Sequence, residues 1–169
     1  MPAPARPALR ADEILKRLTT RGVDFVVIGG IAAVLHGSAQ ATYDLDICYA
    51  TDPGNLAALG EVLVALGARL KGVGEQVRFV PDASTLRRVE LLTMVTRAGE
   101  LDVLARPAGS RGYEALRRNA DRFDIDGFSV LVASIEDLIA MKHATGRQKD
   151  LAAIEELEAI KRLRPRGGD

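Results

Sequence analysis

The chain has 169 residues, 47% hydrophobic and 27% charged, which suits one domain with a sizeable core. The charges of its 23 basic and 23 acidic residues cancel, so the net charge does not indicate a protein that binds nucleic acid non-specifically. No apolar stretch approaches the ~20 residues that cross a bilayer, and no secretory leader is visible at the start. A single cysteine and the absence of CxxC and HExxH patterns argue against disulfides and a zinc site. These features predict a cytoplasmic protein without a membrane partner.

The predicted elements of the first half alternate between helices and strands. Apolar residues recur at helical spacing over residues 8–21, and Asp52-Pro53 is typical of a helix start. In chain order we expect a helix over 8–21, a strand over 23–29, a short helix over 30–37, a strand over 45–50 and a helix over 53–67. Beyond this helix, residues 77–80 can form a strand, and residues 82–88 a loop or a single turn.

The second half contains two hairpin signals and two helices. A turn at Arg97-Ala98-Gly99 separates strands over 89–96 and 100–105, and Asp126-Gly127 separates strands over 122–125 and 128–133. We expect further helices over 111–120, over 135–146 with Ser134 as cap, and over about 148–163. This order indicates an α/β or α+β fold, a sheet with helices packed on it. We expect a single domain, with a core over 1–133 that includes the N-terminal helix and C-terminal helices over 134–169 packed on that core.

Two adjacent glycines follow the first predicted strand. Gly29 and Gly30 stand between an apolar run and a short helix, where free backbone N–H groups at a helix N-terminus attract phosphate. Glycine also lets a backbone come very close to a ligand. The alternative is a tight turn in which glycine only avoids a clash, and the pattern alone does not choose between the two.

Three aspartates interrupt apolar strands. Asp44 and Asp46 lie two residues apart, so both point to one face of their strand, and Asp102 lies between Leu101 and Val103 of a later strand. Adjacent carboxylates repel each other unless a cation holds them, and Mg²⁺ prefers oxygen ligands. The alternative for Asp44 and Asp46 alone is a solvated strand end. Three such carboxylates beside a phosphate-binding corner are what two-metal phosphoryl transfer requires.

The motif Ile28-Gly29-Gly30, followed by Asp44-Leu45-Asp46-Ile47 and the later Leu101-Asp102-Val103, resembles the nucleotidyltransferase superfamily. That superfamily includes DNA polymerase β, CCA-adding enzymes and antibiotic nucleotidyltransferases. The stretch "GGIAAVLHGSAQATYDLDI" and the ending "IEDLIAMKHATGRQKDLAAIEEL" look most like the AbiEii/MenT branch, which contains toxins of toxin–antitoxin pairs. The resemblance covers about residues 20–160 and implies a nucleotidyltransferase-like mixed sheet flanked by helices.

The resemblance implies a role for each matching residue. Asp44, Asp46 and Asp102 would be the catalytic carboxylates and would bind Mg²⁺, with Mn²⁺ as a substitute, and Asp102 would help to activate the acceptor hydroxyl. The nucleotide-binding residues would be Gly29, Gly30, Ser38, Lys142 and Arg147. For Ser38 a helix-end hydroxyl, for Lys142 a solvated lysine and for Arg147 a salt bridge remain alternatives.

Some residues depart from the pattern or have simpler interpretations. Relatives commonly carry Arg where this chain has Gln40, two residues before Thr42, which predicts weaker or different nucleotide binding. For Asp150 we prefer a salt bridge between helices. His36 and His143 are isolated and are interpreted as structural, and Cys48 as a small buried residue without a partner that would activate it.

The predicted function is Mg²⁺-dependent transfer of a nucleoside monophosphate from an NTP to a hydroxyl group, with release of pyrophosphate. The acceptor candidates are an RNA end such as that of tRNA, a protein hydroxyl and a small molecule, and a toxin with an antitoxin partner is one version. Seven basic against four acidic residues over 142–166 favour an acidic polymer, whereas few aromatic residues are available to stack bases. The alternative is a non-catalytic nucleotide-binding or antitoxin-like partner that keeps the same fold.

Overall fold

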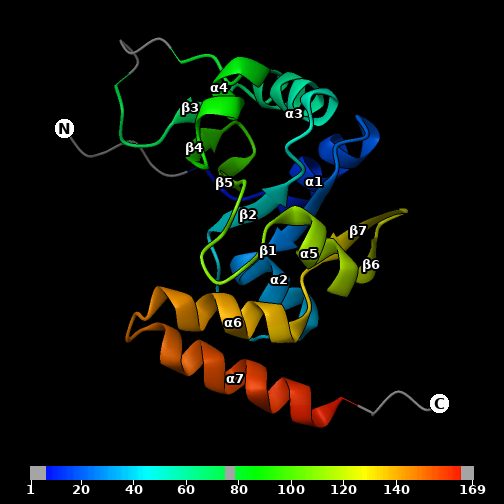
Figure 1. Ribbon diagram of the computed structural model, residues 1–169, viewed down its shortest axis with the longest axis vertical. Coiled ribbons are helices and arrows are strands. Elements are labelled where there is room, and N and C mark those ends of the chain that lie inside the picture. The colour runs from blue at the N-terminus through cyan, green and yellow to red at the C-terminus, as the bar shows by residue number, and fades with distance from the viewer. Residues whose placement is uncertain (1–6, 75–78, 165–169) are drawn as a thin grey trace.

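A mixed sheet of seven strands runs through the part of the chain that the computed structural model describes, residues 7–74 and 79–164 (Figure 1). The strand order is β3-β4-β5-β2-β1-β7-β6. The central pairs β2–β5 and β1–β7 are parallel, and β1–β2 and the outer pairs are antiparallel. The strands are β1 (Phe25–Ile28), β2 (Asp44–Tyr49), β3 (Arg69–Leu70), β4 (Leu91–Thr96), β5 (Gly99–Leu104), β6 (Asp121–Ile125) and β7 (Phe128–Val132).

Helices flank this sheet. They are α1 (Ala11–Thr20), α2 (Gly29–His36), α3 (Pro53–Ala65), α4 (Ala83–Arg88), α5 (Tyr113–Asn119), α6 (Ile135–Thr145) and α7 (Asp150–Leu163). α2 and α5 pack on β1, and α6 packs against α2 and α7. Figure 1 shows α6 and α7 side by side at one end of the molecule and α3 with α4 at the other. No helix among residues 7–74 and 79–164 is both long and apolar enough to cross a membrane.

The predicted mixed architecture is confirmed, and most predicted elements recur within a few residues. Residues 82–88, expected as a loop or a single turn, contain the short helix α4, whose N-cap Asp82 accepts a hydrogen bond from the backbone of Thr85. Strand β3 was not predicted, because two residues are too few for an alternating pattern. Residues 77 and 78 of the possible strand lie outside the described residues, and Phe79 and Val80 are not in a strand.

The turn between β4 and β5 is tighter than predicted. Thr96 pairs with Gly99, so Gly99 belongs to β5 and only Arg97 and Ala98 form the turn. Gly99 has a φ of +114°, and a Cβ on it would lie 2.8 Å from the Cα of Leu9. The close approach of the N-terminal segment therefore requires glycine at this position.

Alternating burial shows which face of the sheet meets the core. In β4, Leu92, Met94 and Thr96 are buried, whereas Leu91, Thr93 and Val95 are exposed or half-buried. In β2, Leu45 and Ile47 are fully buried, while Asp44 and Asp46 on the other face are half-buried. The polar residues of β2 therefore share the less covered face of the sheet.

Asn55 connects the start of β1 with the end of β2. Its Oδ1 accepts from the backbone N–H of Asp24 at 2.7 Å, and its Nδ2 donates to the carbonyls of Asp24 at 3.0 Å and Ala50 at 2.7 Å. The side chain is buried, so these bonds are formed away from water. Asn55 thus fixes the two strands that carry the glycine pair and the first two aspartates.

We expect Asn55→Ala to lower the free energy of unfolding by about 2–3 kcal/mol, because buried backbone groups lose their partners. Urea denaturation measures this change. The control is Asn119→Ala. The exposed side-chain amide of Asn119 donates to Asp137 at 3.3 Å, and its loss should cost less than about 0.5 kcal/mol. Equal stability of the Asn55→Ala protein and the parent would contradict the role of Asn55.

Candidate active site

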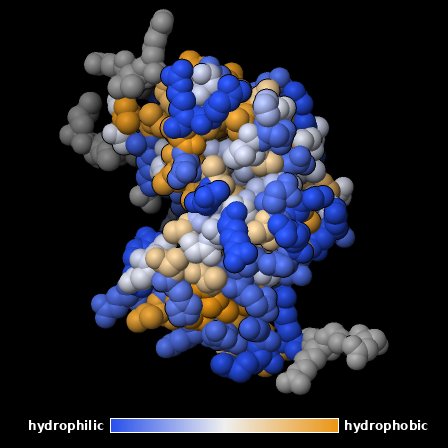
Figure 2. Space-filling model, viewed as in Figure 1, coloured by the Kyte–Doolittle hydropathy of each residue, from blue (hydrophilic) through white to orange (hydrophobic). Residues whose placement is uncertain are grey.

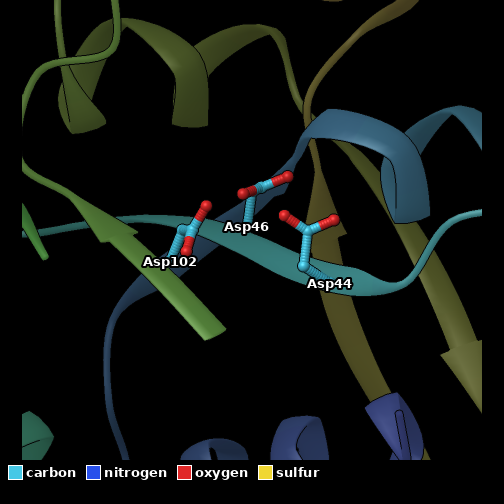
Figure 3. A group of neighbouring side chains, drawn as sticks. All are labelled: Asp44, Asp46 and Asp102. Carbon is cyan, nitrogen blue, oxygen red and sulfur yellow. The ribbon is translucent and has the colours of Figure 1, made fainter. Parts of the chain in front are cut away.

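Three carboxylates converge on the less covered face of the sheet. Asp44 and Asp46 come from β2, and Asp102 of β5 lies directly opposite Asp46 in the parallel pairing. One oxygen of each carboxylate lies within 4.8 Å of the others. Figure 3 shows all three on the same side of β2, with Asp46 between the other two. The convergence predicted from the sequence is therefore present.

This close spacing makes the charged forms of the carboxylates costly. Burial, reinforced by Asp44 and Asp102, raises the pKa of Asp46 to about 8. Burial also raises the pKa of Asp102, and a hydrogen bond with Asp46 offsets part of this increase. The Oδ1 of Asp102 is buried without a hydrogen-bond partner among the described residues. Such an oxygen is uncommon in a folded protein, and among the three in the described residues this is the one that belongs to a cluster of carboxylates.

The donor set fits a divalent cation. Carboxylate oxygens are the ligands of hard cations such as Mg²⁺, and a cation would neutralise the repulsion that raises these pKa values. Asp44, Asp46 and Asp102 would hold the cation. Asp102 is included because its Oδ1 has no hydrogen-bond partner among the described residues. When bound, the cation would supply positive charge to phosphate oxygens and to the attacking hydroxyl.

The two glycines make room for groups of the site. Gly29 has a φ of +69°, and a Cβ on it would lie 2.1 Å from Oδ2 of Asp46. A Cβ on Gly30 would lie 2.6 Å from Oγ1 of Thr42. Both glycines therefore avoid a clash within the protein, and the phosphate-binding role of the pair stays a prediction. The clashing group at Gly29 is a carboxylate of the triad, so Gly29 lets α2 begin beside it.

A second charged group lies where α6 and α7 meet. Asp150 is buried and pairs with the Nζ of Lys142 at 3.4 Å and with the Nε of Arg147 at 3.1 Å, and its Oδ2 accepts from the hydroxyl of Thr145 at 2.8 Å. The salt bridge preferred for Asp150 is thus present. Lys142 also lowers the pKa of Asp46, so its charge acts on the triad from the side of α6.

Gly29 and Gly30 begin α2, and Ser38 follows the opposite, C-terminal end of this helix. Its hydroxyl donates to Oε1 of Glu156 in α7, and the backbone N–H of Ala39 donates to Oε2 of the same residue at 3.2 Å. Gln40 is exposed, and its backbone N–H donates to Oγ of Ser38 at 3.1 Å. These bonds attach the segment before β2 to α7, and they give Ser38 a structural function.

His36 and Cys48 are buried inside the protein, whereas His143 is exposed. Buried His36 donates from Nε2 to the carbonyl of Ala133 at 2.8 Å, and Arg164 donates to its Nδ1. Burial lowers its pKa, which favours the neutral ring. His143 is exposed on α6. Cys48 is fully buried, and burial raises the pKa of its thiol to about 12, so it is inert as predicted.

Sequence reasoning missed a fourth carboxylate on the same face. Glu100 lies opposite Asp44 in the pairing of β2 with β5, is 4% exposed and pairs with the Nζ of Lys71 at 3.4 Å. The spacing Glu100-x-Asp102 was the available signal, because residues two apart in a strand share a face. Lys71 also lowers the pKa of Asp102, which places its charge on the flank of the site formed by β3 and β4.

A mixed sheet with three carboxylates on adjacent strands beside a glycine pair defines the nucleotidyltransferase class. A family model described as aminoglycoside-2''-adenylyltransferase matches residues 11–157, so the chain belongs to this family. The protein is therefore a nucleotidyltransferase enzyme. No curated protein sequence matches the chain. Nothing in these comparisons points to the AbiEii/MenT branch.

Solved structures share the fold. The lincosamide antibiotic adenylyltransferase LnuA with lincomycin bound has a TM-score of 0.60 at 18% identity, covering 90% of this chain and 99% of that one. ANT(2")-Ia in complex with adenylyl-2"-tobramycin has a TM-score of 0.54 at 17% identity, covering 90% and 91%. An antigenic nucleotidyltransferase-like protein from Paracoccidioides brasiliensis has a TM-score of 0.55 at 18% identity, covering 96% and 81%.

The raised pKa of Asp46 predicts how stability depends on pH without metal. The folded-state pKa of about 8 exceeds the ordinary value of 3.8, so the folded protein holds a proton that the unfolded chain has released. This contribution to stability is fully present below about pH 4 and is lost as the pH rises through about 8.

We therefore expect Asp46→Asn to melt at a higher temperature than the parent at pH 8.5 in a chelator, with a smaller difference at pH 6. Thermal unfolding followed by circular dichroism measures both. Addition of Mg²⁺ should raise the melting temperature of the parent more than that of the variant, because Asn removes the charge that holds the metal. Melting profiles that run parallel across this pH range would contradict the raised pKa.

Proposed function

We propose that the protein transfers AMP from ATP to a hydroxyl group of a small-molecule antibiotic of the aminoglycoside or lincosamide kind, with Mg²⁺ as cofactor and release of pyrophosphate. The observation that carries this proposal is the convergence of Asp44, Asp46 and Asp102, where one buried oxygen has no hydrogen-bond partner in the described part of the chain. The family of the chain supports adenylyl transfer to a small molecule.

The transfer is a single displacement. The acceptor oxygen forms a bond to the α-phosphorus of ATP, the bond from that phosphorus to the bridging oxygen of the β-phosphate breaks, and pyrophosphate leaves. The proton of the acceptor hydroxyl passes to Asp102, whose Oδ1 has no hydrogen-bond partner among the described residues. Asp44 and Asp46 form the metal-binding pair next to the glycine corner.

The remaining candidate residues would act on the triphosphate. The backbone N–H groups of Gly29 and Gly30 at the start of α2 would donate hydrogen bonds to phosphate oxygens. Lys142 stands on the α6 side of the triad, and its link to Asp150 limits its freedom of movement. Arg147 shares that carboxylate and is the more exposed of the two cations. In this arrangement the triphosphate lies on the side of α2 and α6. Ser38 is engaged by Glu156, so a phosphate contact from its hydroxyl is the least supported of these roles.

A second acceptor class follows from the likeness to toxin enzymes seen in the sequence. In that version the hydroxyl belongs to the 3′ end of a tRNA or to a protein, and an antitoxin controls the enzyme. Beside that likeness, the basic residues of the C-terminal region support this version. The family model favours the small molecule.

The direct test is incubation of the protein with α-labelled ATP, Mg²⁺ and one acceptor at a time: tobramycin, lincomycin, bulk tRNA or a protein extract. We expect label and a mass gain of one AMP on an antibiotic. Label on tRNA or protein alone would contradict the proposal and favour the toxin. The other three NTPs, tested in parallel, show whether adenine is preferred.

Asp102→Asn should lower the transfer rate about a hundredfold or more and leave ATP affinity within about threefold. The substitution removes the proton acceptor and one metal ligand but leaves Asp44 and Asp46 intact. Single-turnover transfer gives the rate, and calorimetric titration gives the affinity. Asp124→Asn, an exposed aspartate of β6, is the control and should transfer at the parental rate. Parental transfer by Asp102→Asn would remove Asp102 from the mechanism.

A further inference from the structure

The face of the sheet that carries the triad continues past Asp102 to the edge of the sheet. Thr93 of β4 lies opposite Asp102, which lies opposite Asp46. Lys71 follows β3, and its backbone N–H donates to the carbonyl of Thr93 at 3.0 Å. Opposed residues of neighbouring strands share a face. With strands about 4.8 Å apart, this row extends about 10 Å beyond Asp102, which is room for a molecule of one or two rings.

This part of the face is open. Leu91, Thr93 and Val95 are exposed or half-buried, with Leu91 53% exposed, whereas the residues that alternate with them in β4 are buried. Leu91 lies opposite the half-buried Leu104 of β5. Helices α2 and α5 pack on β1, on the other side of the triad. We call the surface formed by Lys71, Leu91, Thr93, Val95 and Leu104 the β4 platform.

The order of groups across the sheet assigns the two substrates to opposite flanks. The glycine corner and Lys142 lie on the side of β1, α2 and α6, next to Asp46. Asp102, the proton acceptor of the proposed reaction, is the triad member nearest β4. An acceptor hydroxyl that approaches Asp102 from the flank opposite the triphosphate therefore comes from the β4 platform.

The chemistry of the β4 platform indicates the kind of acceptor. Leu91, Val95 and Leu104 offer apolar contact, and the hydroxyl of Thr93 offers a hydrogen bond next to Asp102. The charged group at its edge is a cation: Lys71 neutralises the nearly buried Glu100 and is itself 39% exposed. The acids beside the platform are Asp102, opposite Thr93, and Glu100, opposite Val95, and Glu100 is already paired with Lys71. The side chains that form the platform itself are apolar, hydroxylated or basic, so they offer a polycation no carboxylate of their own.

We propose that the β4 platform binds the acceptor, and that it selects a hydroxylated ring compound with an apolar substituent and little positive charge over a polycation. Within the two antibiotic classes considered above, this means a lincosamide-like acceptor rather than an aminoglycoside. The inference rests on the proposed function, because it takes Asp102 as the group that the acceptor hydroxyl approaches. Lys71 and Leu91 determine the specificity, through charge and through apolar contact.

The experiment measures kcat/KM for lincomycin and tobramycin at saturating ATP and Mg²⁺, and binding of lincomycin by calorimetry without nucleotide. The variants are Leu91→Glu, which adds a negative charge to the platform, and Lys71→Gln, which removes the cation and keeps a donor for Glu100. Each should change the ratio of the two kcat/KM values about three- to tenfold in favour of tobramycin. Leu91→Glu should also weaken lincomycin binding, and the KM for ATP should stay within about twofold.

Lys16→Gln is the matched control, since it removes an exposed lysine from α1 and should leave the ratio unchanged. If the parent transfers AMP and both variants have the same ratio of kcat/KM for lincomycin and tobramycin as the parent, the β4 platform is not the acceptor site. The proposed function would still stand. A parent that prefers tobramycin would overturn the charge argument. A parent that labels neither compound would overturn the proposed function and this inference together.

Discussion

The mutual repulsion of Asp44, Asp46 and Asp102 is the constraint on which the structure of the site depends. Three carboxylates with oxygens within 4.8 Å of one another cannot all be ionised in a partly buried place without a compensating charge. Without a cation, burial and the neighbouring carboxylates raise the pKa of Asp46 to about 8, which favours a protonated Asp46 at neutral pH. A divalent cation would also compensate the charges, and the Oδ1 of Asp102, which has no hydrogen-bond partner among the described residues, would be available to it.

The surrounding fold holds these groups together. Parallel pairing of β2 with β5 places Asp46 opposite Asp102, and Gly29 lets α2 begin against the carboxylate of Asp46. Cations stand on both flanks: Lys142, held by Asp150, and Lys71, held by Glu100. Figure 2 shows the face of the molecule seen in Figure 1, where hydrophilic side chains surround smaller apolar areas. In the proposed reaction, the flank of Lys142 would face the triphosphate and the flank of Lys71 the acceptor.

Much of this site could be predicted from the sequence. Burying an unpaired carboxylate among apolar strand residues costs free energy, so such an acid indicates a function. Asp44, Asp46 and Asp102 could therefore be predicted without knowledge of the strand order. Glu100 was missed because its partner Lys71 lies 29 residues away and beside a strand too short to leave a pattern. The contact of Gly29 with Asp46 and the engagement of Ser38 by Glu156 also depend on pairings between distant segments. Local spacing predicts which face a side chain occupies, but it does not predict its neighbour on another strand or helix.

The central claim is that the three aspartates share a divalent cation, and anomalous scattering from crystals grown with Mn²⁺ tests it most directly. We expect a manganese peak in contact with carboxylate oxygens of Asp44, Asp46 and Asp102, and its loss in crystals of Asp46→Asn. Manganese bound elsewhere, or an empty triad at saturating Mn²⁺, would contradict the claim.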